Sequence, residues 1–377
     1  FVNSEKYPFK LRHTIFHQAN KYRFIEAAAE SYYASPYVSN FDTYSYKFSK
    51  NLSNTISLVF DKKTFKLDAG FRHQLINLGT DRVLPTAVGV VIPTENKENR
   101  LGAVGNLEIK LWDKVDLKSF LEYSNGKSFG NYLRSENLLK LEPIKGYILD
   151  AHVNFQSAIP SFNYLMNPSF YQNFNYNFGG AKNQSITEIG GKVNLKWFES
   201  SVFANYFRMD NFAYFGTDFL PKQSSETVNI SQIGGEATLN YWKLKFNTKL
   251  LFQSALSQKE LLPMPNFVGR LNVFYQSKAF KNAAEIQTGF KVYYFSKFKS
   301  RDYFPVLNEF VLSNSGTSIG GQPIADAYFN MKVKRMMIFA EAQHFNTTFM
   351  KNKSFTAPNY PIYDFRLNLG IVWYIFH

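Results

Sequence analysis

The chain has 377 residues, of which 18% are aromatic, and its 43 Lys and Arg outnumber its 29 Asp and Glu to give a formal net charge of +14. It has no cysteine, which suits a periplasm or outer membrane, and no run of about 18 apolar residues, which excludes a membrane-spanning helix. No leader of basic, then apolar, then small residues is visible, so we expect the numbering to begin within a mature or trimmed chain.

Apolar and polar residues alternate with a period of two along most of the chain, which predicts strands with one face in apolar surroundings. The pattern is visible in residues 64–74, 115–123, 147–156 and 243–252, and it is clearest in the C-terminal stretch YDFRLNLGIVWYIFH, 363–377. Helical spacing fits none of these segments. The predicted lipid-facing side of the last strand consists of Phe365, Leu367, Leu369, Ile371, Trp373 and Ile375.

The connections between these strands alternate in length. Short links are expected at 61–63, 113–114, 199–200, 277–279 and 334–335, with tighter bends near Asn125 and Pro143. Long polar segments are expected at 27–43, 77–98, 158–184, 210–227, 256–266, 298–325 and 347–362. This alternation is typical of a transmembrane meander with tight periplasmic turns and long outer loops.

We therefore predict an all-β chain: one transmembrane, antiparallel, up-and-down β-barrel domain over residues 1–377. We count about 16 strands, with 14 and 18 as alternatives, and an even count places both termini on the side of the short turns. Strands of about 10 to 14 residues exceed the usual five or six of globular sheets, which argues against a soluble β-protein. In a bilayer only closure satisfies every backbone group of a sheet, so we expect the barrel to be closed.

Catalytic and metal-binding patterns are weak. The six His show no HExxH or other metal spacing, and no Cys pair or GxSxG occurs, so we expect no cofactor, no metal and no enzyme. Ser124-Asn125-Gly126 resembles part of the active-site stretch of outer-membrane phospholipases, but Glu122 stands where their His would activate the Ser. Ordinary turn chemistry explains it better. Arg100, Arg134 and residues 332–335 are expected to be solvated, and no nucleic-acid partner is expected.

Family resemblance comes from longer stretches. The aromatic terminal strand resembles the signal by which outer-membrane barrels are recognised, which implies the barrel-assembly machinery as a partner. FKLRHTIFHQANKYRFIE, FQSAIPSFNYLMNPSFYQNF, RDYFPVLNEFVL and DAYFNMKVKRMMIFAEAQHF together resemble the putative-porin family of Bacteroidota over most of the chain. That resemblance implies a bacterial outer-membrane location and contact with lipid and lipopolysaccharide. Members are usually longer, which implies that residues before Phe1 are missing.

Strand alternation also assigns a non-lipid face with more cations than carboxylates. The candidate lumen-lining residues are Lys66, Arg72, Lys245, Lys249, Arg270, Lys291, Lys332, Lys334 and Arg366. Rings of Lys or Arg favour anions, so an anion-preferring lumen is one interpretation. The other is that these cations pair with carboxylates such as Glu236, Glu285 and Asp364, which would leave the wall nearly neutral.

These observations predict a porin-like barrel that allows passive diffusion of small polar solutes, with anions as the favoured class in the first interpretation. A structural subunit of a larger outer-membrane protein assembly is the alternative, and a long loop folded into the lumen would favour it. A TonB-dependent receptor without its plug is a third interpretation. Its 22 strands would leave about 17 residues for each strand and connection, which is too few.

Overall fold

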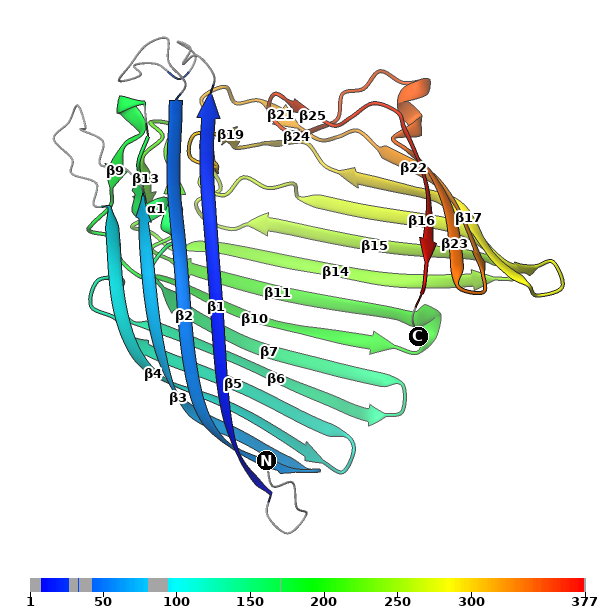
Figure 1. Ribbon diagram of the computed structural model, residues 1–377. Coiled ribbons are helices and arrows are strands. Elements are labelled where there is room, and N and C mark those ends of the chain that lie inside the picture. Colours follow the sequence, from blue (N-terminus) through cyan, green and yellow to red (C-terminus); the bar gives the residue numbers. More distant parts are fainter. Residues whose placement is uncertain (1–7, 27–32, 34–42, 81–93, 170, 376–377) are drawn as a thin grey trace.

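The protein is described by a computed structural model that covers residues 8–26, 33, 43–80, 94–169 and 171–375. Within these residues a single 16-stranded antiparallel sheet dominates (Figure 1), and each strand pairs with its neighbour in chain order. Its strands are β1 Phe9–Glu26, β2 Thr43–Lys62, β3 Phe65–Thr80, β4 Glu95–Leu111, β5 Val115–Asn125, β6 Tyr132–Ile144, β7 Tyr147–Ala158, β10 Gln184–Leu195, β11 Ser200–Asp210, β14 Val228–Tyr241, β15 Leu244–Ala255, β16 Phe267–Ala279, β17 Ala284–Phe295, β22 Ile324–Val333, β23 Met336–Gln343 and β26 Arg366–Trp373.

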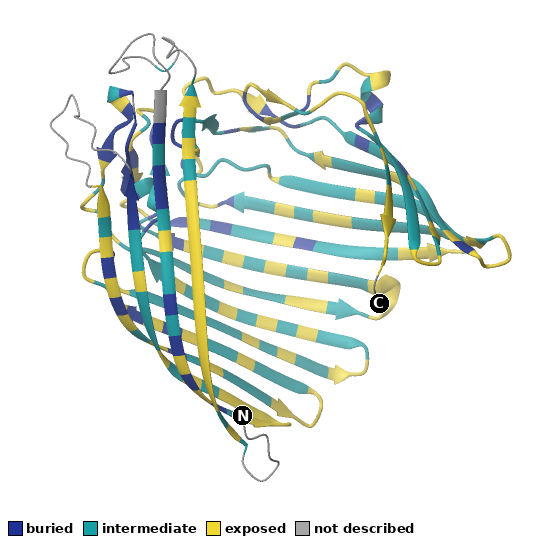
Figure 2. Ribbon diagram, viewed as in Figure 1, coloured by how far each residue is buried: buried dark blue, intermediate teal, exposed yellow. Residues whose placement is uncertain are grey.

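The two faces of the sheet follow the alternation in the sequence. Large apolar side chains on one face are exposed, for example Leu367, Leu369 and Ile371 on β26, and Leu369 is 71% exposed. Exposed and less exposed residues alternate along many strands in Figure 2. A sheet with this much apolar surface is stable only where that surface meets an apolar phase, so the exposed face is the lipid-facing face. Phe365 and Ile375, which the sequence pattern assigns to the same face of this strand, are also exposed but lie just outside β26.

The strand connections confirm the meander, with two corrections. Long segments join most of the strands at one end of the sheet, called here the loop end, where 126–131 is a shorter connection, and short turns join them at the other, the turn end. The turn expected at 277–279 is wrong, because Ser277 and Lys278 pair with Ile286 and Glu285, and the turn lies at 280–283. A short turn at Trp242 and Lys243 was not expected. β1 begins and β26 ends at the turn end, as the even count predicts.

The expected closure of the sheet is not made. Among the described residues, β1 pairs with β2 along its whole length and β26 pairs with β23, and β1 and β26 are not paired with each other. The sheet therefore curves around an interior and has two free edges (Figure 1).

At the loop end, three long connections pack together into what we call the loop cap, residues 159–183, 211–227 and 296–323. Its centre is a cluster of buried side chains: Tyr171, Phe174, Tyr176, Phe215, Val306, Leu307 and Val311. The short elements of the cap are α1 Phe162–Leu165, β8 Met166–Asn167, η2 Gln172–Phe174, β9 Tyr176–Asn177, β12 Ala213–Phe215, β13 Pro221–Gln223, β18 Phe298–Lys299, β19 Asp302–Phe304, β20 Glu309–Val311 and β21 Ser318–Ile319. The remaining short elements are η3 Trp197–Glu199, η4 Phe345–Thr348, β24 Phe355–Ala357 and β25 Tyr360–Pro361.

Candidate functional site: the polar inner wall

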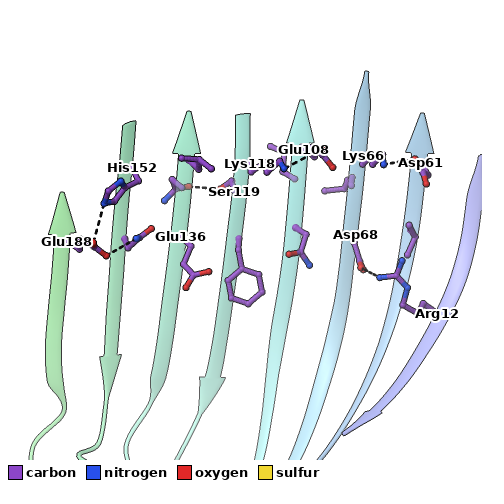
Figure 3. Close-up of a pocket in the computed structure, with 18 residues that line it drawn as sticks. Arg12, Asp61, Lys66, Asp68, Glu108, Lys118, Ser119, Glu136, His152 and Glu188 are labelled. Atoms are coloured by element: carbon purple, nitrogen blue, oxygen red, sulfur yellow. Dashed lines mark hydrogen bonds and ion pairs between the residues drawn. The ribbon is translucent and has the colours of Figure 1, made fainter. Parts of the chain in front are cut away.

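The face of the sheet opposite the lipid-facing side carries the polar side chains and forms a concave inner wall. Between β1 and β10 this wall borders a cavity of about 960 Å³ (Figure 3). Polar residues recur at every second position along much of these strands, so polar side chains of neighbouring strands lie close enough to interact on the wall. The acidic and basic residues that line the cavity are Arg12, Asp61, Lys66, Asp68, Glu108, Lys118, Glu136, His152 and Glu188.

Most of these charges are matched across strands. Arg12 Nη1 lies 2.6 Å from Asp68 Oδ2, and Lys66 Nζ lies 3.7 Å from Asp61 Oδ1. His152 Nε2 lies 3.2 Å from Glu188 Oε1, the other oxygen of which accepts a hydrogen bond from Asn154. Five carboxylates against three Lys and Arg give this half of the wall no excess of positive charge.

The other half of the inner wall, from β14 to β26, carries most of the predicted lumen-lining cations. Glu236 lies 3.8 Å from Lys249 Nζ and 3.9 Å from Arg270 Nη2, and Arg270 also donates to Asn247. Lys291 Nζ lies 3.6 Å from Glu341 and 4.7 Å from the centre of the Tyr328 ring. This pairing is the arrangement that the neutral-wall interpretation requires.

The remaining predicted residues fall in different places. Arg72, on β3, binds Glu122 at 2.5 Å and also donates to Thr55. Lys245 lies opposite the uncharged Asn240 and Phe274 in the ladder, whereas Lys332 lies opposite Glu285.

The last two predicted lumen-lining residues, Arg366 and Lys334, lie at or near strand ends. The Arg366 guanidinium stacks on Tyr363 at 4.0 Å. Lys334 lies in the turn between β22 and β23, so its assignment to the wall is wrong. Alternation continues through Lys334 in the sequence, although β22 ends one residue earlier, at Val333.

A buried ion pair at the loop end was not anticipated. Arg100 and Glu98, both on β4, are almost fully buried and bind each other. Arg100 donates to the carbonyl oxygens of Phe129 and Gly130, and the Glu98 carboxylate accepts the backbone N–H groups of Ser128 and Phe129. The pair therefore holds the short 126–131 connection against the wall, and the expectation that Arg100 is solvated is wrong. An Arg two residues after a Glu on one strand face was the available signal.

The loop cap is attached to the inner wall on β1 and β2. The Tyr22 hydroxyl donates to the carbonyl oxygen of Pro305. The buried Lys47 ammonium donates to Asn167 Oδ1 at 3.1 Å and to the Leu307 carbonyl oxygen at 3.2 Å. Tyr22 and Lys47 are ladder partners and share the face of Arg12, so these contacts lie inside the mouth.

The attachment of the loop cap connects the two edges of the sheet. Residues 296–323 connect β17 to β22, near one edge, yet they contact the first two strands at the opposite edge. Sequence reasoning did not detect the cap, because its residues come from three loops without periodicity.

Ser124 has no catalytic partner in the part of the chain that the structure describes. Its side chain is fully buried, and Glu122, two residues earlier, binds Arg72. No cluster of three or more His, Asp or Glu suited to a metal ion occurs among the described residues. None of the described helices has the length and apolar character needed to span a membrane.

His13 and His17 lie on the outward face of β1. They alternate with Arg12 and Thr14, so they share that face with the exposed Leu11 and Ile15. Neither His therefore belongs to the inner wall.

Comparison with solved structures shows the fold. The ferric enterobactin receptor PfeA, a Pseudomonas aeruginosa protein, matches with a TM-score of 0.70 and 13% identity over 95% of this chain and 59% of that chain. The siderophore receptor PirA from Acinetobacter baumannii matches with a TM-score of 0.64 and 10% identity, over 96% and 59%. The FrpB iron transporter from Neisseria meningitidis gives 0.63 and 13%, over 95% and 61%.

This chain therefore spans less than two thirds of the length of these structures, and it has the fold of their outer-membrane barrels. A search of curated proteins finds no match. A family model described as putative porin matches residues 2–377. The chain belongs to the putative porin family.

Proposed function

We propose that the inner wall is a route for passive diffusion of small polar solutes across the outer membrane. The observation that supports this function is the polar wall itself, in which Lys and Arg pair with carboxylates of other strands at 2.6–4.0 Å around a cavity of about 960 Å³. A wall of paired charges can form hydrogen bonds with a solute without presenting one strong binding site of a single charge. Conduction requires such weak, distributed binding, because a solute must leave as readily as it enters.

A modest anion preference is the finer part of the proposal, and it rests on the β14–β26 half of the wall. There Lys245 lies opposite uncharged ladder partners, while the cavity near β1–β10 has more carboxylates than Lys and Arg. We therefore expect any selectivity to be weak and to originate from one side of the lumen.

The test is solute flux through the purified native protein in lipid vesicles. We expect vesicle swelling with small neutral sugars to exceed that of protein-free vesicles, and swelling to decline as the sugar becomes larger. A neutral solute is used because its flux reports an open path without any contribution from charge selectivity.

The loop cap supports a second candidate function, a structural or interaction subunit whose lumen is blocked. The cap lies inside the mouth, where it would obstruct solutes that enter from the loop end. Leu307→Asp separates the two functions, because Leu307 is fully buried in the cap and a carboxylate there should unpack it.

Each outcome has a distinct meaning. Swelling with the unaltered protein supports passive diffusion. Swelling with Leu307→Asp alone shows that the cap is a barrier on the same route. If neither protein supports flux while both insert correctly, passive diffusion is wrong and the structural role is favoured.

A further inference from the structure

Phe120 places an apolar ring in the polar cavity of the inner wall. It lies on β5 and shares the inward face with Lys118 and Glu122. Among the described residues it is the only Phe, Tyr or Trp that lines the cavity, and it belongs to none of the buried apolar clusters that these residues form. Neither contact with lipid nor the packing of the loop cap therefore explains an aromatic side chain at this position.

One row of the strand ladder crosses Phe120 and is polar on both sides of the ring. In register, the row contains Asn106, Phe120, Glu136, Asn154 and Glu188, one residue from each of β4, β5, β6, β7 and β10. All of them line the cavity, and Figure 3 shows Glu136 and Glu188 along this wall. Neighbouring strands lie about 4.8 Å apart, so the row extends about 19 Å across the wall.

The polar row ends at Glu188. The ladder partner of Glu188 on β11 is Phe207, which packs against the buried cluster that contains Met209 and Phe212. Packing explains the ring of Phe207, whereas it does not explain the ring of Phe120. The row around Phe120 is therefore a bounded part of the wall.

The two carboxylates of the row are held by neighbouring side chains. Glu136 Oε1 accepts a hydrogen bond from Arg134 Nε at 2.8 Å, and the Arg134 guanidinium lies 5.4 Å from the centre of the Phe120 ring. Glu188 Oε2 accepts a hydrogen bond from Asn154 at 3.0 Å. These contacts orient the carboxylates, and because each carboxylate has about four acceptor positions, others stay available for a ligand.

Asn106, at the opposite end of the row from Glu188, has a free amide. Within the described part of the chain it makes no side-chain hydrogen bond, so its donors and its acceptor are available to a molecule in the cavity. A hydroxyl group both donates and accepts, so a ligand with several hydroxyl groups matches the amides and the carboxylates of the row. The C–H groups of a sugar ring match Phe120, because the face of an aromatic ring carries partial negative charge.

We propose that this row is a carbohydrate subsite on the diffusion route, with Phe120 as the surface on which one sugar ring packs and the flanking amides and carboxylates as partners of its hydroxyl groups. The inference rests on the proposed function, since it names the solute class of the same wall. An inorganic anion fits less well, because the cavity has more carboxylates than Lys and Arg. An organic cation is the competing ligand. Binding is expected to be weak, because a solute on this route must also leave.

Binding of maltohexaose, a neutral linear sugar, to the purified native protein in detergent micelles tests the subsite. Saturation-transfer NMR detects weak binding and does not require the solute to cross a membrane. We expect saturable binding that Phe120→Leu weakens by about two- to tenfold, since the ring is lost while the apolar character stays. Phe120→Tyr, which keeps the ring, should retain the affinity. Phe274→Leu is the matched control, because Phe274 is an inward-facing Phe on β16 that does not line the cavity, and its replacement should not change the affinity.

Three results would overturn the proposal. The first is the absence of saturable binding, and the second is a loss of affinity that is no larger for Phe120→Leu than for Phe274→Leu. The third is tighter binding of spermidine than of maltohexaose, with a steep loss between 0.1 M and 1 M KCl, because screening weakens the attraction of a cation and not that of a neutral sugar.

Vesicle swelling with small sugars distinguishes a failure of the subsite from a failure of the proposed function. Swelling without maltohexaose binding would leave passive diffusion standing and remove the subsite. Binding that depends on Phe120 without swelling would support the subsite and contradict passive diffusion.

Discussion

The wall and the loop cap use apolar side chains in opposite ways. On the wall they point outward, as with Leu369, which is 71% exposed, and the sheet is held together by its backbone ladder. In the cap they point inward, as with Phe215, which is fully buried between Tyr164 and Tyr176. The wall therefore depends on the membrane, whereas the cap depends on side-chain packing and should be able to unfold while the wall stays intact.

Removing the centre of the cap is expected to have the largest effect. Phe215→Ala should lower the free energy of cap unfolding by about 3–5 kcal/mol, because a buried ring is lost. Hydrogen exchange of the amides in 211–227 and 296–323 should then accelerate by about two to four orders of magnitude. Exchange in β14 and β15 should not change.

Phe310→Ala is the matched control, since Phe310 belongs to the same cap but is 45% exposed and lies outside its buried centre. Equal acceleration by both variants would show that the cap has no packed centre. Acceleration in β14 and β15 would show that the cap and the wall unfold together, which would remove the distinction between the two regions.

The corresponding change on the wall is Leu369→Arg. A charge on the lipid-facing side near mid-membrane should reduce the free energy of unfolding in lipid vesicles by about 2–4 kcal/mol, measured by denaturant titration. Asn368→Arg is the control, because this neighbour faces the inner wall and water. The opposite ranking would mean that the register of β26 is shifted by one residue, since one step exchanges the two faces.

The same distinction explains what could be predicted from the sequence. A period of two residues repeats along each strand, so the faces, the meander and the count of 16 strands were available from local pattern alone. Strand ends were not, because alternation does not indicate where pairing stops, and Lys334 and the 277–279 turn were misplaced for that reason.

Contacts between segments far apart in the sequence have no periodic pattern that would predict them. The cap brings Tyr171, Phe215 and Leu307 together from three loops, and only their aromatic and apolar content is visible in the sequence. The polar character of the inner wall was predictable, but the pairing of individual charges depends on the register between strands. The expectation of a closed barrel rested on the needs of a bilayer and not on a local pattern, and the 16 strands of the described residues do not close on themselves.

Alkaline pH should loosen the cap before it affects the wall. Burial, followed by the nearby Glu309 carboxylate, raises the pKa of Tyr164 to about 12, and the same causes raise the pKa of Tyr176 well above its usual range. Both phenols are neutral in the packed cap and ionise near pH 10 once exposed, so their contribution to cap stability is full below about pH 10 and is lost as the pH rises toward 12.

Proteolysis of the cap loops in vesicles, measured against pH, detects this transition. Tyr164→Phe should weaken the pH dependence, because it removes one of the ionising groups while keeping the ring that stacks on Phe215 at 4.6 Å. An unchanged proteolysis rate up to pH 12 would contradict the packing of these phenols in the cap.

The smallest expected effect concerns the charge of the wall. Replacing Lys245, Lys249 and Lys332 with Gln should shift the reversal potential in a KCl gradient by a few millivolts toward cation preference, because these residues contribute positive charge to one side of the lumen. The shift should be largest at low salt, since the screening length falls from about 10 Å at 0.1 M to about 3 Å at 1 M. Lys334→Gln is the matched control, because that residue lies in a turn and not on the wall. An equal shift from Lys334→Gln would place the selectivity at the turn end of the pore, and a cation preference in the unaltered protein would remove the anion proposal while leaving passive diffusion untouched.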